Sequence, residues 1–151
     1  MTENYGMTEN YGVTDDDFLR RAIAQAALAV ATGDAPFGSL LVGADGAVLV
    51  EEHNTVLTDG DITAHPELKL ARWAAQSLTP EVAAGTTMYT SCQPCQMCTG
   101  AIARSGLGRV VFALSNDQLA EMKPGGGWPV VPQHGPSLYD EARAVIDSYY
   151  D

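Results

Sequence analysis

The chain has few basic residues. Eight lysines and arginines stand against 19 aspartates and glutamates, which gives a formal net charge of −11. Binding to nucleic acid depends largely on Lys and Arg side chains that neutralise phosphates. The basic residues are scattered along the sequence without forming a stripe, so a polymeric anionic substrate is disfavoured. The excess of acid can also serve solubility alone.

Long apolar runs and a secretory signal are also missing. No apolar run approaches the length of about 18 residues that a membrane span needs, and no basic segment followed by an apolar one opens the chain. The three cysteines are an odd number, and two of them form a Cys-x-x-Cys pair, so a disulfide framework is not expected. These absences favour a cytoplasmic protein that binds no membrane.

The length and composition fit one globular domain. A chain of 151 residues, of which 46% are hydrophobic, is long enough to bury a core. Residues 1–6 and 7–12 repeat the same six amino acids, a duplication too short to be a structural repeat. We expect residues 1–12 to be disordered and residues 13–151 to form the domain.

Helical and strand patterns alternate along the domain. Thr14 with three following aspartates predicts the start of a helix, and Thr32-Gly33-Asp34 predicts its end. Asp45-Gly46 predicts a hairpin turn. Further strands are expected at 87–90 and 109–113, and further helices after His65, at 95–105 and from about residue 137. This order favours a central sheet with helices on its faces. A Gly- and Pro-rich loop is expected at 123–129.

Four side chains in two short segments could form a catalytic metal site. His65 and Glu67 lie in one segment, and Cys95 and Cys98 lie in the other. One imidazole and two thiolates bind zinc tetrahedrally and leave the fourth position open. Cysteines three residues apart in the first turn of a helix lie on one face, where the helix N-terminus stabilises thiolates. Glu67 could then hold a proton beside the open position.

Other interpretations of the cysteine pair remain. A Cys-x-x-Cys segment also occurs in structural zinc sites and in redox pairs. A structural site would need a fourth protein ligand. The candidates are His53, His134 and Cys92, although Cys92 suits a small buried apolar position better.

The two segments together resemble the zinc-dependent nucleobase deaminases of the cytidine deaminase-like superfamily. The resemblance is greatest to the branch of guanine deaminases, cytosine deaminases and tRNA adenosine deaminases, and it spans about residues 14–115. It is carried by four strings of sequence: Ala35-Pro36-Phe37-Gly38, His53-Asn54-Thr55-Val56, residues 61–67, and residues 89–102 around Pro94-Cys95-Gln96-Met97-Cys98.

The resemblance implies a fold, a cofactor and site residues. The fold is an α/β, three-layer α/β/α arrangement around a five-stranded mixed sheet, usually in a homodimer. One Zn²⁺ per subunit would be held by His65, Cys95 and Cys98, with Glu67 as the catalytic proton carrier. The substrate-binding residues would be Asn54, Phe37, Ala64 and Pro94, the last through the backbone N–H that follows it.

Several of these residues have an alternative role. Asn54 could cap the loop after a strand, and Phe37 could belong to the core. Asp117 and Glu121 lie where some guanine deaminases supply a second acid. Trp128 and Tyr149 could close over a planar ring or pack in a dimer interface. Pro66, Gln93 and Gln96 depart from the residues common in the family, which affects the prediction of substrate preference more than that of catalysis.

The sequence therefore favours a zinc-dependent hydrolase that deaminates a free amino-substituted base, guanine or a guanine-like ring above others. The alternatives are a cytosine, triazine or nucleoside deaminase, a tRNA adenosine deaminase, and a zinc-stabilised module without activity. The acidity of the chain makes nucleic acid an unsuitable partner.

Overall fold

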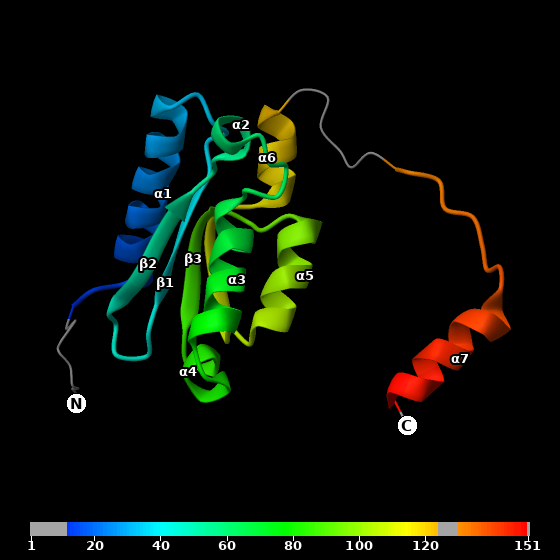
Figure 1. Ribbon diagram of the computed structural model, residues 1–151. Helices are drawn as coiled ribbons and strands as arrows, with labels where there is room; N and C mark the ends of the chain where they lie inside the picture. The colour runs from blue at the N-terminus through cyan, green and yellow to red at the C-terminus, as the bar shows by residue number, and fades with distance from the viewer. Residues whose placement is uncertain (1–11, 124–129, 151) are drawn as a thin grey trace.

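The computed structural model describes residues 12–123 and 130–150, and these form a mixed sheet with helices on both faces (Figure 1). The prediction of disorder for residues 1–12 concerns residues that, apart from Gly12, lie outside the described part of the chain. In chain order the elements are α1 (Asp15–Ala31), β1 (Gly38–Val42), β2 (Val48–His53), α2 (Val56–Asp59), α3 (Pro66–Ser77), α4 (Pro80–Ala84), β3 (Thr87–Cys92), α5 (Gln96–Ser105), β4 (Arg109–Leu114), α6 (Asn116–Met122) and α7 (Tyr139–Tyr150).

Local sequence signals account for the ends of these elements. Thr14 begins α1 as expected, and it forms a capping box with Asp17 in which each side chain bonds the backbone of the other residue. Gly106 ends α5 in the left-handed conformation, with φ at 89°. Ser115 and Gln118 form a second capping box, which begins a helix, α6, that was not predicted.

The strands lie in the order β2-β1-β3-β4. β1 pairs antiparallel with β2 and with β3, whereas β3 pairs parallel with β4, so the sheet is mixed as predicted. The described residues form four strands, so the expectation of five is wrong for this part of the chain. Residues 130–138 have no regular structure, and Pro132 and Pro136 there lack the N–H groups that a strand ladder needs.

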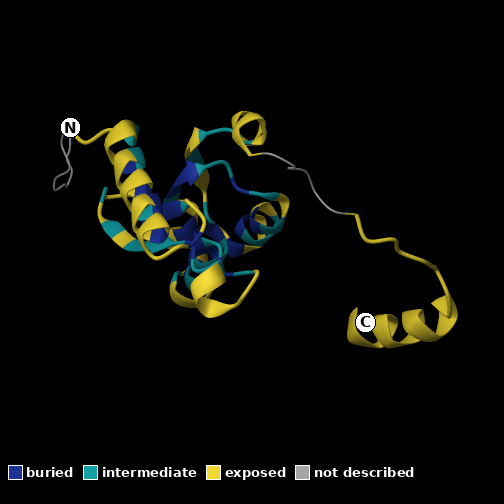
Figure 2. Ribbon diagram, turned by 90° about the horizontal axis from the view of Figure 1, so that it is seen from above, coloured by how far each residue is buried: buried dark blue, intermediate teal, exposed yellow. Residues whose placement is uncertain are grey.

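Each face of the sheet has its own core. Leu40 and Val42 of β1 pack with Phe18 and Ala22 of α1. Leu41 points to the opposite face, because side chains alternate along a strand. There it belongs to the cluster formed with α3 and α5, whose buried members are Leu41, Leu70, Ala71, Ala74, Met88 and Ile102. Figure 2 shows this buried centre between exposed helix surfaces.

The described part of α7 and its approach do not join these cores. Every described residue from 130 to 150 is exposed, and α7 lies apart from the sheet in both views (Figures 1 and 2). No helix in the described part of the chain is long and apolar enough to cross a membrane.

Candidate metal centre and active site

Two helix N-termini bring the predicted metal ligands together. His65 is the N-cap of α3, Cys95 is the N-cap of α5, and Cys98 lies in the first turn of α5. The Nδ1 atom of His65 lies 3.7 Å from the Sγ atom of Cys95 and 3.5 Å from that of Cys98. α3 and α5 pack against each other, so two segments thirty residues apart in sequence meet at one end of this helix pair.

These distances match a shared zinc ion. Tetrahedral zinc with bonds of about 2.05 Å to nitrogen and about 2.3 Å to sulfur places the two ligand atoms about 3.6 Å apart. All three ligand atoms lie within 4.8 Å of one another. A single imidazole and two sulfurs are also the donor types that zinc prefers. The residues therefore fit the ion that the sequence predicts.

Hydrogen bonds among the three ligands shift the pKa of each one. A hydrogen bond from the Cys98 thiol lowers the pKa of Cys95 to about 4, so Cys95 is a thiolate at neutral pH. The hydrogen bond with Cys95 raises the pKa of His65 and also that of Cys98. Both groups lose a proton when a metal binds, because zinc takes a neutral imidazole and thiolates. Cys92 differs from Cys95, because burial raises the pKa of the Cys92 thiol and keeps it protonated.

The predicted alternatives for a fourth protein ligand do not join the cluster. Among residues 12–123 and 130–150, the group that could hold a metal consists of His65, Cys95 and Cys98. The Nδ1 atom of His53 instead lies 3.3 Å from Oε1 of Gln25, and His134 lies in the exposed segment before α7. The described residues thus leave a fourth coordination position to water or substrate, as a catalytic zinc site requires.

Glu67 lies beside the ligands in the first turn of α3 and is only 5% exposed. Burial raises the pKa of its carboxyl from 4.5 to about 7. A carboxyl with this pKa can both accept and donate a proton near neutral pH, which suits general acid–base catalysis.

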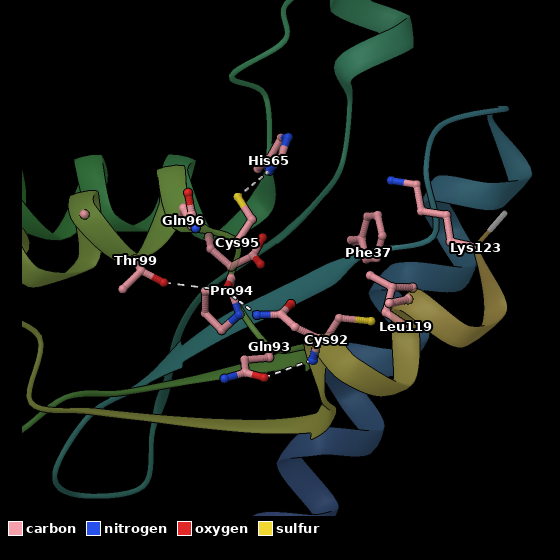
Figure 3. A pocket seen from close by; sticks show the side chains of 14 residues that line it. Phe37, His65, Cys92, Gln93, Pro94, Cys95, Gln96, Thr99, Leu119 and Lys123 are labelled. Carbon is pink, nitrogen blue, oxygen red and sulfur yellow. Dashed lines mark hydrogen bonds between the residues drawn. The ribbon is translucent and has the colours of Figure 1, made fainter. Parts of the chain in front are cut away.

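A cavity of about 1020 Å³ opens over this centre (Figure 3). Phe37 and Pro94 line it as expected, together with His65, Glu67 and Cys95. One wall was not predicted. It comes from α6 and the residue that ends it, and it consists of Asn116, Leu119, Ala120 and Lys123.

The other predicted substrate residues lie close to the cavity without lining it. Asn54 is 2% exposed, and its Oδ1 atom accepts a hydrogen bond of 2.9 Å from the Val56 N–H. This bond caps the loop after β2, which is the alternative role given for Asn54 in the sequence analysis. The Asn54 N–H donates to the carbonyl of Phe37 at 3.0 Å. Ala64 is buried, and its carbonyl accepts from the Thr55 N–H at 3.1 Å.

The residues proposed as a second acid or a lid have different positions. Asp117 and Glu121 belong to α6 but are not among the residues that line the cavity. Tyr149 is 81% exposed on α7, and Trp128 lies outside the described residues.

Comparison with known proteins agrees with this site. Residues 13–114 match the cytidine and deoxycytidylate deaminase zinc-binding region. The "Probable cytosine deaminase" of Schizosaccharomyces pombe is 34% identical over 129 residues, which cover 85% of this chain and 74% of that protein.

The chain belongs to the cytidine and deoxycytidylate deaminase family.

Guanine deaminase of Bacillus subtilis is another similar member of the family, 38% identical over 107 residues that cover 70% of this chain and 68% of that protein. Its crystal structure superimposes with a TM-score of 0.73 over 92% of this chain and 96% of that chain, with 28% identity over this longer stretch. tRNA-specific adenosine deaminases are also relatives. The family and the His/Cys/Cys cluster together identify a zinc-dependent hydrolytic deaminase.

Proposed function

We propose that this deaminase releases ammonia from a free amino-substituted base, guanine or a guanine-like ring. The observation that carries the proposal is the cavity, which is lined by Glu67, by the metal ligands His65 and Cys95, and otherwise mainly by uncharged side chains. A bound zinc ion with an open position lowers the pKa of water and so supplies a nucleophile at neutral pH. Glu67 takes the proton that water loses and delivers it to the ring nitrogen. It then takes a second proton, from the hydroxyl group added to the ring carbon, and delivers this one to the amine, which leaves as ammonia.

The net charge of the chain favours a free base over a tRNA as substrate. The net charge is −11, and Lys123 is the one cationic side chain of Lys or Arg type that lines the cavity in the described part of the chain. A tRNA deaminase must bind a polyanion, which depends on many Lys and Arg contacts. The relationship to Bacillus subtilis guanine deaminase supports a purine, while the cytosine deaminase relative keeps pyrimidines as a second candidate.

A screen with ammonia detection tests the proposal. Guanine, cytosine, an aminotriazine, the matching nucleosides and a tRNA anticodon stem-loop should be offered to the zinc-loaded protein at equal concentration. We expect turnover with guanine or a related free base. A salt-sensitive complex with the stem-loop together with its deamination would contradict the proposal, and zinc binding without any turnover would indicate a module without activity.

We also propose that the enzyme is a cytoplasmic homodimer. The support for a dimer is α7 with the residue before it. This segment carries apolar side chains at helical spacing that no described residue covers: Leu138, Val145, Ile146 and Tyr149, each more than half exposed. An apolar stripe of this kind usually packs against another surface. Sedimentation equilibrium should give twice the mass of the chain, and a Val145→Glu protein should shift toward the monomer. A wild-type protein that is monomeric at micromolar concentration would contradict the dimer.

A further inference from the structure

The carbonyl group of Pro94 is held from two sides. Asn116, the first residue of α6, donates from Nδ2 to this oxygen at 3.3 Å. Thr99 in α5 donates to the same oxygen from its hydroxyl at 3.5 Å, a longer and weaker bond. Figure 3 shows Thr99 and Pro94 on the wall of the cavity. Pro94 directly precedes the metal ligand Cys95, so both bonds act on the peptide group that joins these two residues.

Asn116 is itself fixed in place by a second residue. Its backbone N–H donates to Oε1 of Gln93 at 2.9 Å. The Gln93 N–H in turn donates to the carbonyl of Leu114 at 2.7 Å, and the Ser115 capping box fixes the start of α6. The ends of β3 and β4 and the beginnings of α5 and α6 are therefore tied together at one point.

Peptide planarity transmits this constraint to Cys95. In a planar trans peptide the N–H points opposite to the C=O. A Pro94 carbonyl that faces Asn116 and Thr99 therefore directs the Cys95 N–H away from α6. That N–H belongs to the N-cap residue of α5 and donates to no acceptor among the described residues. It lies next to the sulfur that faces His65.

We propose that Asn116 is a positioning residue for the deamination reaction. By holding the Pro94 carbonyl, it aims the Cys95 N–H at the oxygen that adds to the ring carbon of the substrate. The N–H donates most strongly when negative charge develops in the transition state, and it needs no reorganisation at that moment. Asn116 acts through the peptide group and makes no contact with the substrate itself.

The expected effect is a loss of kcat. Removing a donor of this type altogether lowers kcat by about 10²–10³-fold. Loss of the Asn116 bond leaves the N–H in place and Thr99 still bound to the carbonyl, so we expect a fall of roughly tenfold with KM changed by less than about twofold. Asn116→Asp is the sharpest variant, because it keeps the size and the backbone bond to Gln93 and replaces the donor with an acceptor.

The experiment compares Asn116→Asp, Asn116→Leu and wild type, with Met122→Ala as a control on the exposed side of α6, where Met122 is 65% exposed. Zinc content and melting temperature are measured first. The inhibition constants of two competitive inhibitors follow. One is planar, and the other has a tetrahedral reacting carbon that carries a hydroxyl group.

The proposal predicts that both Asn116 variants keep one zinc per chain, and that the inhibition constant of the tetrahedral compound rises in step with the fall in kcat/KM. The planar compound should bind as it does to wild type. Equal weakening of both inhibitors would show direct substrate contact, and loss of zinc or of thermal stability in Asn116→Asp would show a purely structural role. Either result, or an unchanged kcat, would overturn the proposal.

Discussion

Glu67→Gln tests the catalytic site most directly, because we expect it to lower kcat and to raise the stability of the fold at high pH. Glu67 is 5% exposed, and burial raises its pKa from 4.5 to about 7. At pH 7 such a carboxyl is about half protonated, whereas one with a pKa of 4.5 would be protonated in only about 0.3% of molecules. In the metal-free protein both proton-transfer forms are therefore populated. Gln has nearly the same shape but can neither accept nor deliver the proton.

We expect the variant to lose about 10²–10⁴-fold in kcat, which is the contribution typical of a positioned general acid–base. The raised pKa also has a consequence for stability. An acid whose folded pKa exceeds its unfolded pKa favours folding below pH 4.5, and this contribution is lost as the pH rises through about 7. Ionised Glu67 then destabilises the fold by about 3 kcal/mol, and the neutral amide avoids this cost.

The assay combines ammonia release at pH 7 with urea unfolding at pH 4 and pH 8. Glu67→Gln should be about as stable as wild type at pH 4 and more stable at pH 8. The full gain is expected in zinc-free protein, because a bound cation favours the ionised carboxylate and lowers its pKa. Glu81→Gln in α4, away from the cavity, is the matched control. A zinc-containing Glu67→Gln protein that releases ammonia at the parental rate would refute the assigned role.

Three further predictions concern the metal and the fold. Chelation of zinc should abolish turnover and lower the melting temperature, and added zinc should restore both; free zinc at 1,000 times Kd would stabilise the fold by about 4 kcal/mol. Asp34 accepts bonds from the Thr58 side chain and backbone and from the Thr32 hydroxyl, which lower its pKa to about 2. This stabilisation is present above the unfolded pKa of 3.8 and is lost toward pH 2. Wild type should therefore have a higher melting temperature than Asp34→Asn at pH 7 but hardly a higher one at pH 2. An equal difference at the two pH values would contradict this role of Asp34. In Gly38→Ala the new methyl would lie 2.4 Å from backbone atoms of α1, and we expect a loss of about 1–3 kcal/mol in urea unfolding. Gly100 lines the cavity in α5, where the nearest atom to a new methyl is 4.0 Å away, so Gly100→Ala should gain about 1 kcal/mol. Equal effects of the two substitutions would refute the steric argument.

The metal ligands could be predicted from the sequence because their geometry is mostly local. Cys95 and Cys98 share one turn of α5, and Pro66 marks the start of α3 directly after His65. Only the packing of α3 against α5 depends on tertiary structure, and it was inferred from the resemblance to the family. The pKa of Glu67 has another origin. It depends on burial by side chains from several elements, and no short string of sequence reports it.

The α6 wall of the cavity was not predicted, although its signal was present. Ser115 and Gln118 have the spacing of a capping box, so a helix at 116–122 could have been found. Which face of that helix meets the cavity depends on the bond between Gln93 and the Asn116 N–H, which joins residues 23 positions apart. Sequence periodicity places Asn116, Leu119 and Lys123 on one side of α6 but does not say what lies opposite.

The same limit applies to α7. The helical spacing of Leu138, Val145 and Tyr149 predicts a helix with an apolar face, and the structure confirms the helix (Tyr139–Tyr150). Periodicity does not name the partner of that face, because the pattern is the same whether the helix packs on its own sheet or on another chain. The five-strand expectation was wrong for the described residues for a related reason, since it came from the family and not from any strand pattern after Leu114.

Pro66 shows how a departure from the family's common residues can leave the site intact. Pro66 is the first residue of α3, where the N–H that proline lacks would have no partner within the helix. The ring also restricts His65 to extended backbone, and His65 has φ −79° and ψ 142°. In this conformation His65 is the N-cap of α3 and its imidazole lies beside the two sulfurs. Glu67 follows in the first turn of the helix. Proline at this position therefore pre-organises the ligand that precedes it and the proton carrier that follows it, which is why its effect should be on rigidity and not on the identity of the metal.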